Sequence, residues 1–131
     1  MSMDWKDRGP KNEWMRLVKS FSYAMNGIKN AIAKERNLQI HLFISLLVFL
    51  LAFYFEISRE EWIILICLIG AMVTLELVNT AIERLVDLVT KDYHPLAKLA
   101  KDISAGAVLT FAFTSVIVGL IIFWPYFSQL L

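Results

Sequence analysis

Three long apolar segments, separated by short charged stretches, constrain most strongly what this chain can fold into. They cover residues 38–55, 62–75 and 103–127. A helix that spans a bilayer needs about 20 predominantly apolar residues, so the shorter second segment is expected to continue as a helix to residue 83. The chain has 131 residues, of which 58% are hydrophobic, and a water-soluble core of that length has no room for three such segments. The sequence predicts an all-α integral membrane protein, a single domain over residues 1–131, with transmembrane helices at 38–55, 62–83 and 103–127.

A different pattern precedes the first apolar segment. Residues 1–12 are polar and show no early apolar stretch of the kind found in a signal peptide, so we expect the first span to be retained. Over residues 13–33, apolar side chains recur at three- and four-residue steps, which predicts an amphipathic helix. Its polar face is basic, which favours a helix lying in the membrane interface over one packed on protein.

The distribution of Lys and Arg predicts the orientation in the membrane. Basic residues are frequent before the first span and recur between the second and third, where Arg84, Lys91, Lys98 and Lys101 lie. The connection between the first two spans contains only Arg59, and nothing basic follows the third. The positive-inside rule therefore predicts a cytoplasmic N-terminus and an external C-terminus in a cell membrane. A net charge of +1 gives no indication of a nucleic-acid partner.

Polar residues at the end of the second apolar segment are the strongest functional signal. Glu76, Asn79, Thr80, Glu83 and Asp87 are spaced by three or four residues, so on a helix they share one face. Ionisable residues this close to hydrocarbon indicate a functional site by default. The alternative is a polar stripe that holds helices together in an oligomer, but two glutamates with Asn and Asp on one face favour function.

Two other polar clusters are predicted at the same membrane boundary. Residues 34–37 lead into the first span, and Lys101 and Asp102 precede the third. Carboxylates without Cys or His partners suit Mg²⁺ rather than zinc, and a magnesium site beside Lys and Arg is typical of phosphoryl transfer. No phosphate-binding glycine-rich loop is present, so a nucleotide would be held by helix side chains.

The segment 76–87, which reads E-L-V-N-T-A-I-E-x-x-V-D, resembles the signature of the prokaryotic diacylglycerol kinase family of small membrane enzymes. Lys101-Asp102 and Asn26-Gly27-Ile28 also fit, and the resemblance extends from about residue 16 to residue 127. The residues 34–37 with His41, and 93–98, look more like the Gram-positive branch, whose characteristic activity is phosphorylation of undecaprenol.

This resemblance implies an ATP- and Mg²⁺-dependent lipid kinase built as a homotrimer. It implies that Glu76 is the general base facing the lipid hydroxyl. It also implies that Glu35 and Glu83 hold Mg²⁺ with the ATP phosphates, and that Asn79 orients these magnesium ligands. The nucleotide contacts that it implies are Arg16, Tyr23, Lys101 and Asp102, with Asp92, Tyr93 and His94 near the outer part of the nucleotide.

Several alternatives remain open at this stage. His41 stands where the enterobacterial branch has an acidic residue, and we expect its ring to extend toward the interface rather than to pair with a carboxylate. Asp87 is either catalytic or part of the helix end. The leading function is an undecaprenol kinase. The alternatives are a diacylglycerol kinase, a small ion transporter and a structural membrane subunit, but no polar track crosses the outer halves of the spans, and a structural role leaves Glu35, Lys101 and Asp102 unexplained.

Overall fold

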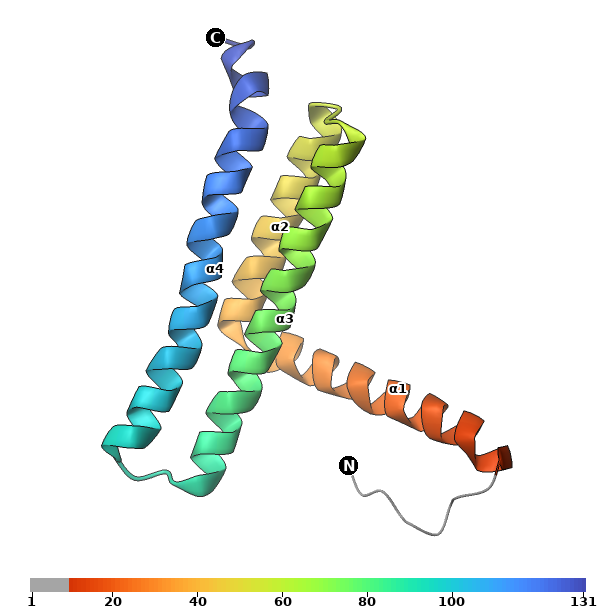
Figure 1. Cartoon of the computed structure of the whole chain (residues 1–131), viewed down its shortest axis with the longest axis vertical. Helices are drawn as coiled ribbons and strands as arrows, with labels where there is room; N and C mark the ends of the chain where they lie inside the picture. The colour runs from red at the N-terminus through yellow and green to blue at the C-terminus, as the bar shows by residue number, and fades with distance from the viewer. Residues whose placement is uncertain (1–9) are drawn as a thin grey trace. The chain divides into compact units, whose positions relative to one another are not determined.

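The computed structural model describes residues 10–131, which form four helices and no strand within that range. They are α1 (Pro10–Lys34), α2 (Arg36–Tyr54), α3 (Arg59–Val89) and α4 (Pro95–Ser128) (Figure 1). The last three are each long and apolar enough to cross a membrane. The prediction of an all-α membrane protein with three spans is confirmed.

The described chain divides into two compact units, which are best considered separately. The first contains α1, and the second is Glu35–Leu131. Helix α1 has exposed apolar side chains at Trp14, Leu17 and Phe21, and it begins three residues before the predicted start at residue 13. These side chains make α1 amphipathic, as predicted.

Within the second unit, α3 packs against both α2 and α4 (Figure 1). Helix α3 begins with a capping box, in which the Ser58 hydroxyl accepts from the Glu61 amide and the Glu61 carboxylate accepts from the Ser58 amide. This arrangement satisfies amide groups that the first turn leaves without helical partners. The preceding turn is closed by Glu56, whose φ of 50° is in the left-handed region.

A small apolar core lies where α2, α3 and α4 meet beside this turn. It contains the buried side chains of Ala52, Ile57, Leu65, Ile122 and Phe123. At its edge the Tyr126 hydroxyl donates to the Glu61 carboxylate at 2.6 Å. Tyr126 therefore ties the end of α4 to the start of α3.

Helices α3 and α4 are longer than the predicted spans of 62–83 and 103–127. Helix α3 continues to Val89 and α4 begins at Pro95. The residues added carry charged side chains among apolar ones, so they lie outside the continuous apolar segments, yet they extend the helices without a break. Pro95 is favoured in a first helical turn, and His94 caps α4 by accepting the Leu96 amide at its Nδ1. Lys98, Lys101 and Asp102 therefore lie on a helix rather than in a connecting segment.

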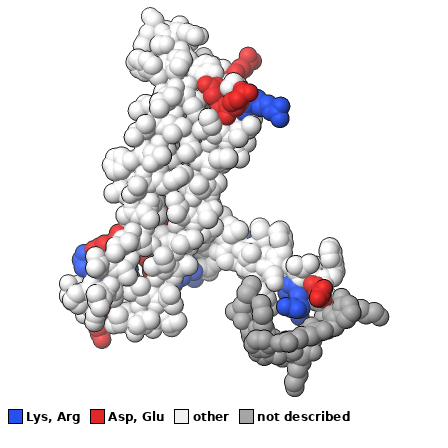
Figure 2. Space-filling view, viewed as in Figure 1, with Lys and Arg blue, Asp and Glu red and all other residues white. Residues whose placement is uncertain are grey.

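On the face of the three-helix unit that Figure 2 shows, surface charge gathers at the two ends. Figure 2 shows acidic and basic side chains at the α2–α3 turn and again near the α3–α4 connection, with an uncharged surface between them. Along that surface most large apolar side chains of α2, α3 and α4 are exposed. An apolar band between two charged ends is the surface that a bilayer requires.

Candidate active site

A buried polar group interrupts the apolar interior on α3. Glu76 is 2% exposed, Asn79 is 7% exposed and Thr80 is 5% exposed. Their spacing places them on one helical face, and that face is directed inward rather than toward the exposed apolar surface. The prediction that this part of 76–87 forms one polar face is confirmed.

His41 of α2 contacts the deepest of these carboxylates. Its Nε2 lies 3.1 Å from Oε1 of Glu76. The expectation that the His41 ring extends toward the interface is therefore wrong. Leu38, three residues earlier on α2, is fully buried, so this face of α2 packs inward, and it directs the imidazole toward α3.

One turn beyond Glu76, Asn79 and Glu83 form a second contact along the same helix. The Asn79 Nδ2 donates to Oε1 of Glu83 at 3.2 Å. The Oδ1 atom of Asn79 is buried and accepts no hydrogen bond from the protein. A buried acceptor without a donor is costly, so this oxygen is available to a ligand.

Glu35, the residue before α2, reaches the same region. Its Oε1 accepts from the Arg84 guanidinium at 2.9 Å. The two residues are 49 positions apart in sequence, and the contact joins the start of α2 to the last third of α3. The predicted meeting of the 34–37 cluster with the 76–87 segment is confirmed.

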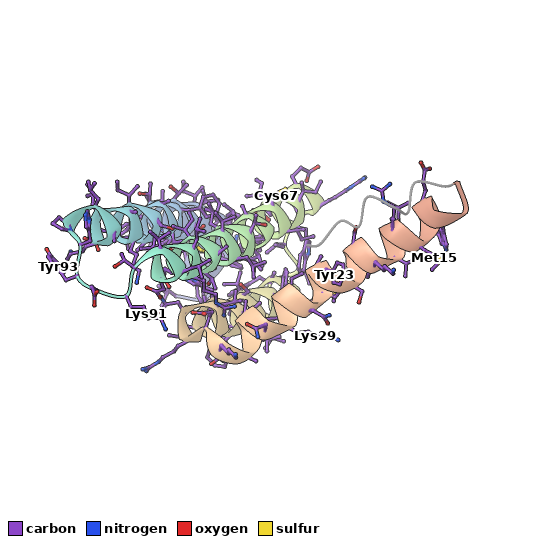
Figure 3. All side chains as sticks on the ribbon, turned by 90° about the horizontal axis from the view of Figure 1, so that it is seen from below. Met15, Tyr23, Lys29, Cys67, Lys91 and Tyr93 are labelled. Atoms are coloured by element: carbon purple, nitrogen blue, oxygen red, sulfur yellow. The ribbon has the colours of Figure 1, made fainter. Side chains whose placement is uncertain are left out.

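The third cluster meets α3 through an ion pair between Lys101 and Asp87. Beside this pair is an open pocket of about 310 Å³ whose lining includes Asp92, Tyr93 and His94. Figure 3 shows Lys91 and Tyr93 on the connection between α3 and α4. The pocket lies at the charged end of the helices, where a water-soluble ligand has access, and it contains three lysines: Lys91, Lys98 and Lys101.

The donor set at this end fits a hard divalent cation. The oxygens available are the carboxylates of Glu35 and Glu83 and the unpartnered amide oxygen of Asn79. Over the part of the chain that the structure describes, no three His, Cys, Asp or Glu side chains group closely enough to hold a metal on their own. Mg²⁺ is typically bound by one or two carboxylates together with substrate phosphates, so an incomplete protein shell fits Mg²⁺ with a nucleotide.

Three of the predicted site residues are not brought into these contacts. Arg16 and Tyr23 lie exposed on α1, in the other compact unit. Asp102 pairs with Lys98 on its own helix, four residues away. Their predicted contacts with a nucleotide stay predictions.

Two residues of the site have partners that the sequence does not predict. From the sequence, Arg84 is one of the basic residues between two spans, and an interfacial position is favoured for His41. In the structure His41 contacts the Glu76 carboxylate and Arg84 contacts the Glu35 carboxylate. The spacing of residues within one helix does not indicate that residues 35 and 84, or residues 41 and 76, approach each other.

Comparison with known proteins gives consistent results over most of the chain. Residues 22–123 match the model of the prokaryotic diacylglycerol kinase family. The undecaprenol kinase of Bacillus subtilis is 50% identical over 123 residues, which cover 94% of this chain and 98% of that protein. A diacylglycerol kinase of Synechocystis is 42% identical over 83% of this chain and 65% of its own length. The diacylglycerol kinase of Escherichia coli is 29% identical over 86% of this chain and 93% of its own length.

Proposed function

The chain belongs to the prokaryotic diacylglycerol kinase family, and we propose that it transfers the γ-phosphate of ATP to the hydroxyl of undecaprenol, giving undecaprenyl phosphate. The observation that carries this proposal is the position of Glu76. It is a buried carboxylate between an apolar surface, which a lipid can approach, and an open charged pocket, which a nucleotide can reach. The 50% identity to a protein named undecaprenol kinase favours that lipid alcohol.

Glu76 acts as the general base in this reaction. An alcohol is a poor nucleophile, and a positioned carboxylate removes its proton as the new bond to phosphorus forms. The lipid oxygen bonds to the γ-phosphorus, the bond between that phosphorus and the β–γ bridging oxygen breaks, and ADP leaves. The proton passes from the lipid hydroxyl to the Glu76 carboxylate.

Glu35 and Glu83 are the residues that would hold Mg²⁺, with Asn79 beside them. When bound, the cation offsets the negative charge of the transferring phosphoryl group. The Glu35 carboxylate would then be shared between the cation and the Arg84 guanidinium, which contacts its Oε1.

The nucleotide occupies the end of the unit where α3 and α4 are connected. Lys101 contacts the phosphates, and Asp92, Tyr93 and His94 contact the outer part of the nucleotide in the pocket they line. Asp102, Arg16 and Tyr23 complete the nucleotide contacts. Because α3 rises about 1.5 Å per residue, the pocket residue Asp87 is only about one turn beyond Glu83.

The proposed setting is a bacterial cell membrane, with the N-terminus in the cytoplasm, the C-terminus outside and α1 in the interface. All 131 residues act as one lipid kinase domain, and the functional unit is a homotrimer. Glu76, Asn79 and Thr80 are already buried within one chain, so an oligomer would shield the half-buried Glu83 and the exposed Asp87 further along the same face.

Diacylglycerol is the second candidate substrate, because the Synechocystis and Escherichia coli relatives are named for it. Both alcohols undergo the same reaction, so the fold does not separate them. The test is transfer of radiolabelled phosphate from ATP to undecaprenol and to diacylglycerol, each presented at the same mole fraction in detergent micelles.

Faster labelling of undecaprenol is the expected result. Faster labelling of diacylglycerol would show that diacylglycerol, rather than undecaprenol, is the preferred substrate. Labelling of neither lipid, by a preparation that binds ATP, would reject the kinase proposal. Glu76→Gln serves as the control for contaminating kinases, because it retains the fold while lacking the base.

A further inference from the structure

We infer that His41 is a positioning residue, which holds the Glu76 carboxylate through one oxygen so that the other faces the lipid hydroxyl. The inference rests on the proposed function for its chemistry, but it predicts a contact that is measurable without any lipid. It concerns a residue for which the sequence left two alternatives, a carboxylate partner and an interfacial position, and favoured the second.

The contact joins a buried carboxylate to a partly accessible imidazole. The Glu76 side chain is 3% exposed and the His41 side chain is 24% exposed, with Nε2 and Oε1 3.1 Å apart. An ionised carboxylate only accepts hydrogen bonds, so Nε2–H of His41 is the donor. With Oε1 engaged in this way, Oε2 is the oxygen left for the hydroxyl proton.

The position of His41 on α2 is itself well defined. Leu38 packs on the same face and is fully buried. Ser45, one turn further along, donates from its hydroxyl to the His41 carbonyl at 2.7 Å. The Ser45 bond lies within α2, so it is the packing of Leu38 that presents the imidazole to α3 at a fixed place, which is what a positioning residue requires.

The geometry explains why such a partner matters. A glutamate side chain has three rotatable bonds, and a general base must lie within about 2.6–3.2 Å of the proton it removes. A misplacement of about 1 Å can cost about 10²-fold in rate. Because Glu76 is buried away from water, it also needs a hydrogen-bond donor from the protein. His41 supplies both the orientation and the donor.

The first test is NMR of the imidazole nitrogens in protein labelled with ¹⁵N-histidine. The chain contains two histidines, so His41→Gln identifies the His41 signals by their disappearance. We expect His41 Nε2 to carry a proton and to shift in Glu76→Ala, which removes the acceptor. Ser45→Ala, which leaves both side chains in place, is the control. His41 signals that are the same in wild type and Glu76→Ala would overturn the inference.

The second test is kinetic and uses two replacements of different chemistry. His41→Leu removes the donor, and we expect kcat to fall about 10²-fold with little change in the KM for ATP. His41→Gln retains a neutral N–H donor and should recover most of the lost turnover. An equal loss of kcat in both variants, with unchanged thermal unfolding, would show that turnover does not depend on the N–H donor at position 41.

A double-mutant cycle separates positioning from a general structural effect. If His41 acts through Glu76, then adding His41→Leu to Glu76→Gln should reduce kcat much less than it does in the wild type. Multiplicative losses would contradict the inference. If the protein phosphorylates neither lipid but the NMR contact is present, the proposed function fails while the His41–Glu76 contact stands. If it phosphorylates a lipid and the contact is absent, only the role of His41 fails.

Discussion

At the scale of single residues, depth along α3 separates carboxylates of the same chemical type. Glu76 is buried, whereas Glu83 is partly exposed and Asp87 is exposed. At about 1.5 Å per residue, Glu83 lies roughly 10 Å closer than Glu76 to the charged end of the helix. This order of depth supports the proposed base at Glu76, where a lipid hydroxyl would approach, and the proposed metal ligand at Glu83, nearer to a nucleotide.

Glu76→Gln should abolish most turnover while leaving nucleotide binding nearly intact. The amide retains the shape of the side chain but does not accept the alcohol proton, and loss of a general base typically costs on the order of 10² to 10⁴ in rate. Single-turnover phosphate transfer measures the first effect, and equilibrium binding of ATP measures the second. Loss of ATP binding along with turnover would place Glu76 in the nucleotide and metal site instead.

Glu83→Gln and Glu35→Gln should each raise the Mg²⁺ concentration needed for half-maximal activity and greatly reduce the maximum. Each removes one carboxylate from a donor set that already depends on the phosphates to complete the metal shell. A Mg²⁺ titration at fixed ATP measures the midpoint. Glu60→Gln is the matched control, since Glu60 is exposed at the opposite end of α3. An unchanged midpoint in either variant would exclude that residue from the metal shell.

At the scale of helices, the two ends of the three-helix unit are held by different interactions. Near the α2–α3 turn, α4 is tied to α3 by the apolar core and by the Tyr126–Glu61 hydrogen bond. At the other end the ties are the ion pairs of Glu35 with Arg84 and of Asp87 with Lys101. The proposed chemistry lies at the ion-paired end, so the apolar end acts as the stable support.

Tyr126→Phe should lower thermal stability without changing the KM for either substrate at low temperature. The variant removes a hydrogen bond to a carboxylate, and such bonds are stronger than those between neutral groups. Because Glu61 is only partly buried, we expect a small fall in the melting temperature. Thermal unfolding in detergent is the measurement. Tyr54→Phe, at an exposed tyrosine near the same turn, provides the control. Equal melting temperatures for the two variants would mean that the hydrogen bond does not hold α4 in place.

At the scale of the whole molecule, charge asymmetry sets the orientation. Basic residues precede α2 and recur around the α3–α4 connection, whereas the α2–α3 turn has Arg59 alone and no Lys or Arg follows Lys101. An odd number of spans then places the two termini on opposite sides of the membrane. The positive-inside rule therefore predicts that the N-terminus and the α3–α4 connection lie on the cytoplasmic side, where ATP is.

Cysteine labelling in intact cells tests this orientation. In a Cys67→Ala background, an impermeant thiol reagent should modify Glu60→Cys and Gln129→Cys from outside. It should modify Lys91→Cys only after lysis. Glu60 and Gln129 are both exposed, so cysteines there are accessible to the reagent. Labelling of Lys91→Cys in intact cells, without labelling of the other two, would reverse the proposed topology.

The sequence alone determined the architecture, because membrane insertion depends on the length and hydropathy of local segments, and those are written consecutively along the chain. It also placed Glu76, Asn79 and Glu83 on one face, because helical periodicity is local. The helix ends were less well predicted. The last turns of α3 and the first turns of α4 contain charged residues, so they lie outside the continuous apolar segments although they are helical.

Only the tertiary structure decided which polar residues become partners. His41 meets Glu76 and Arg84 meets Glu35 across two helices, and the rotation of each helix about its axis determines which side chains face each other. That rotation results from packing at residues such as Leu38 and Ala52, which are fully buried. Packing of this kind depends on contacts between distant segments, so no pattern within a single segment specifies it.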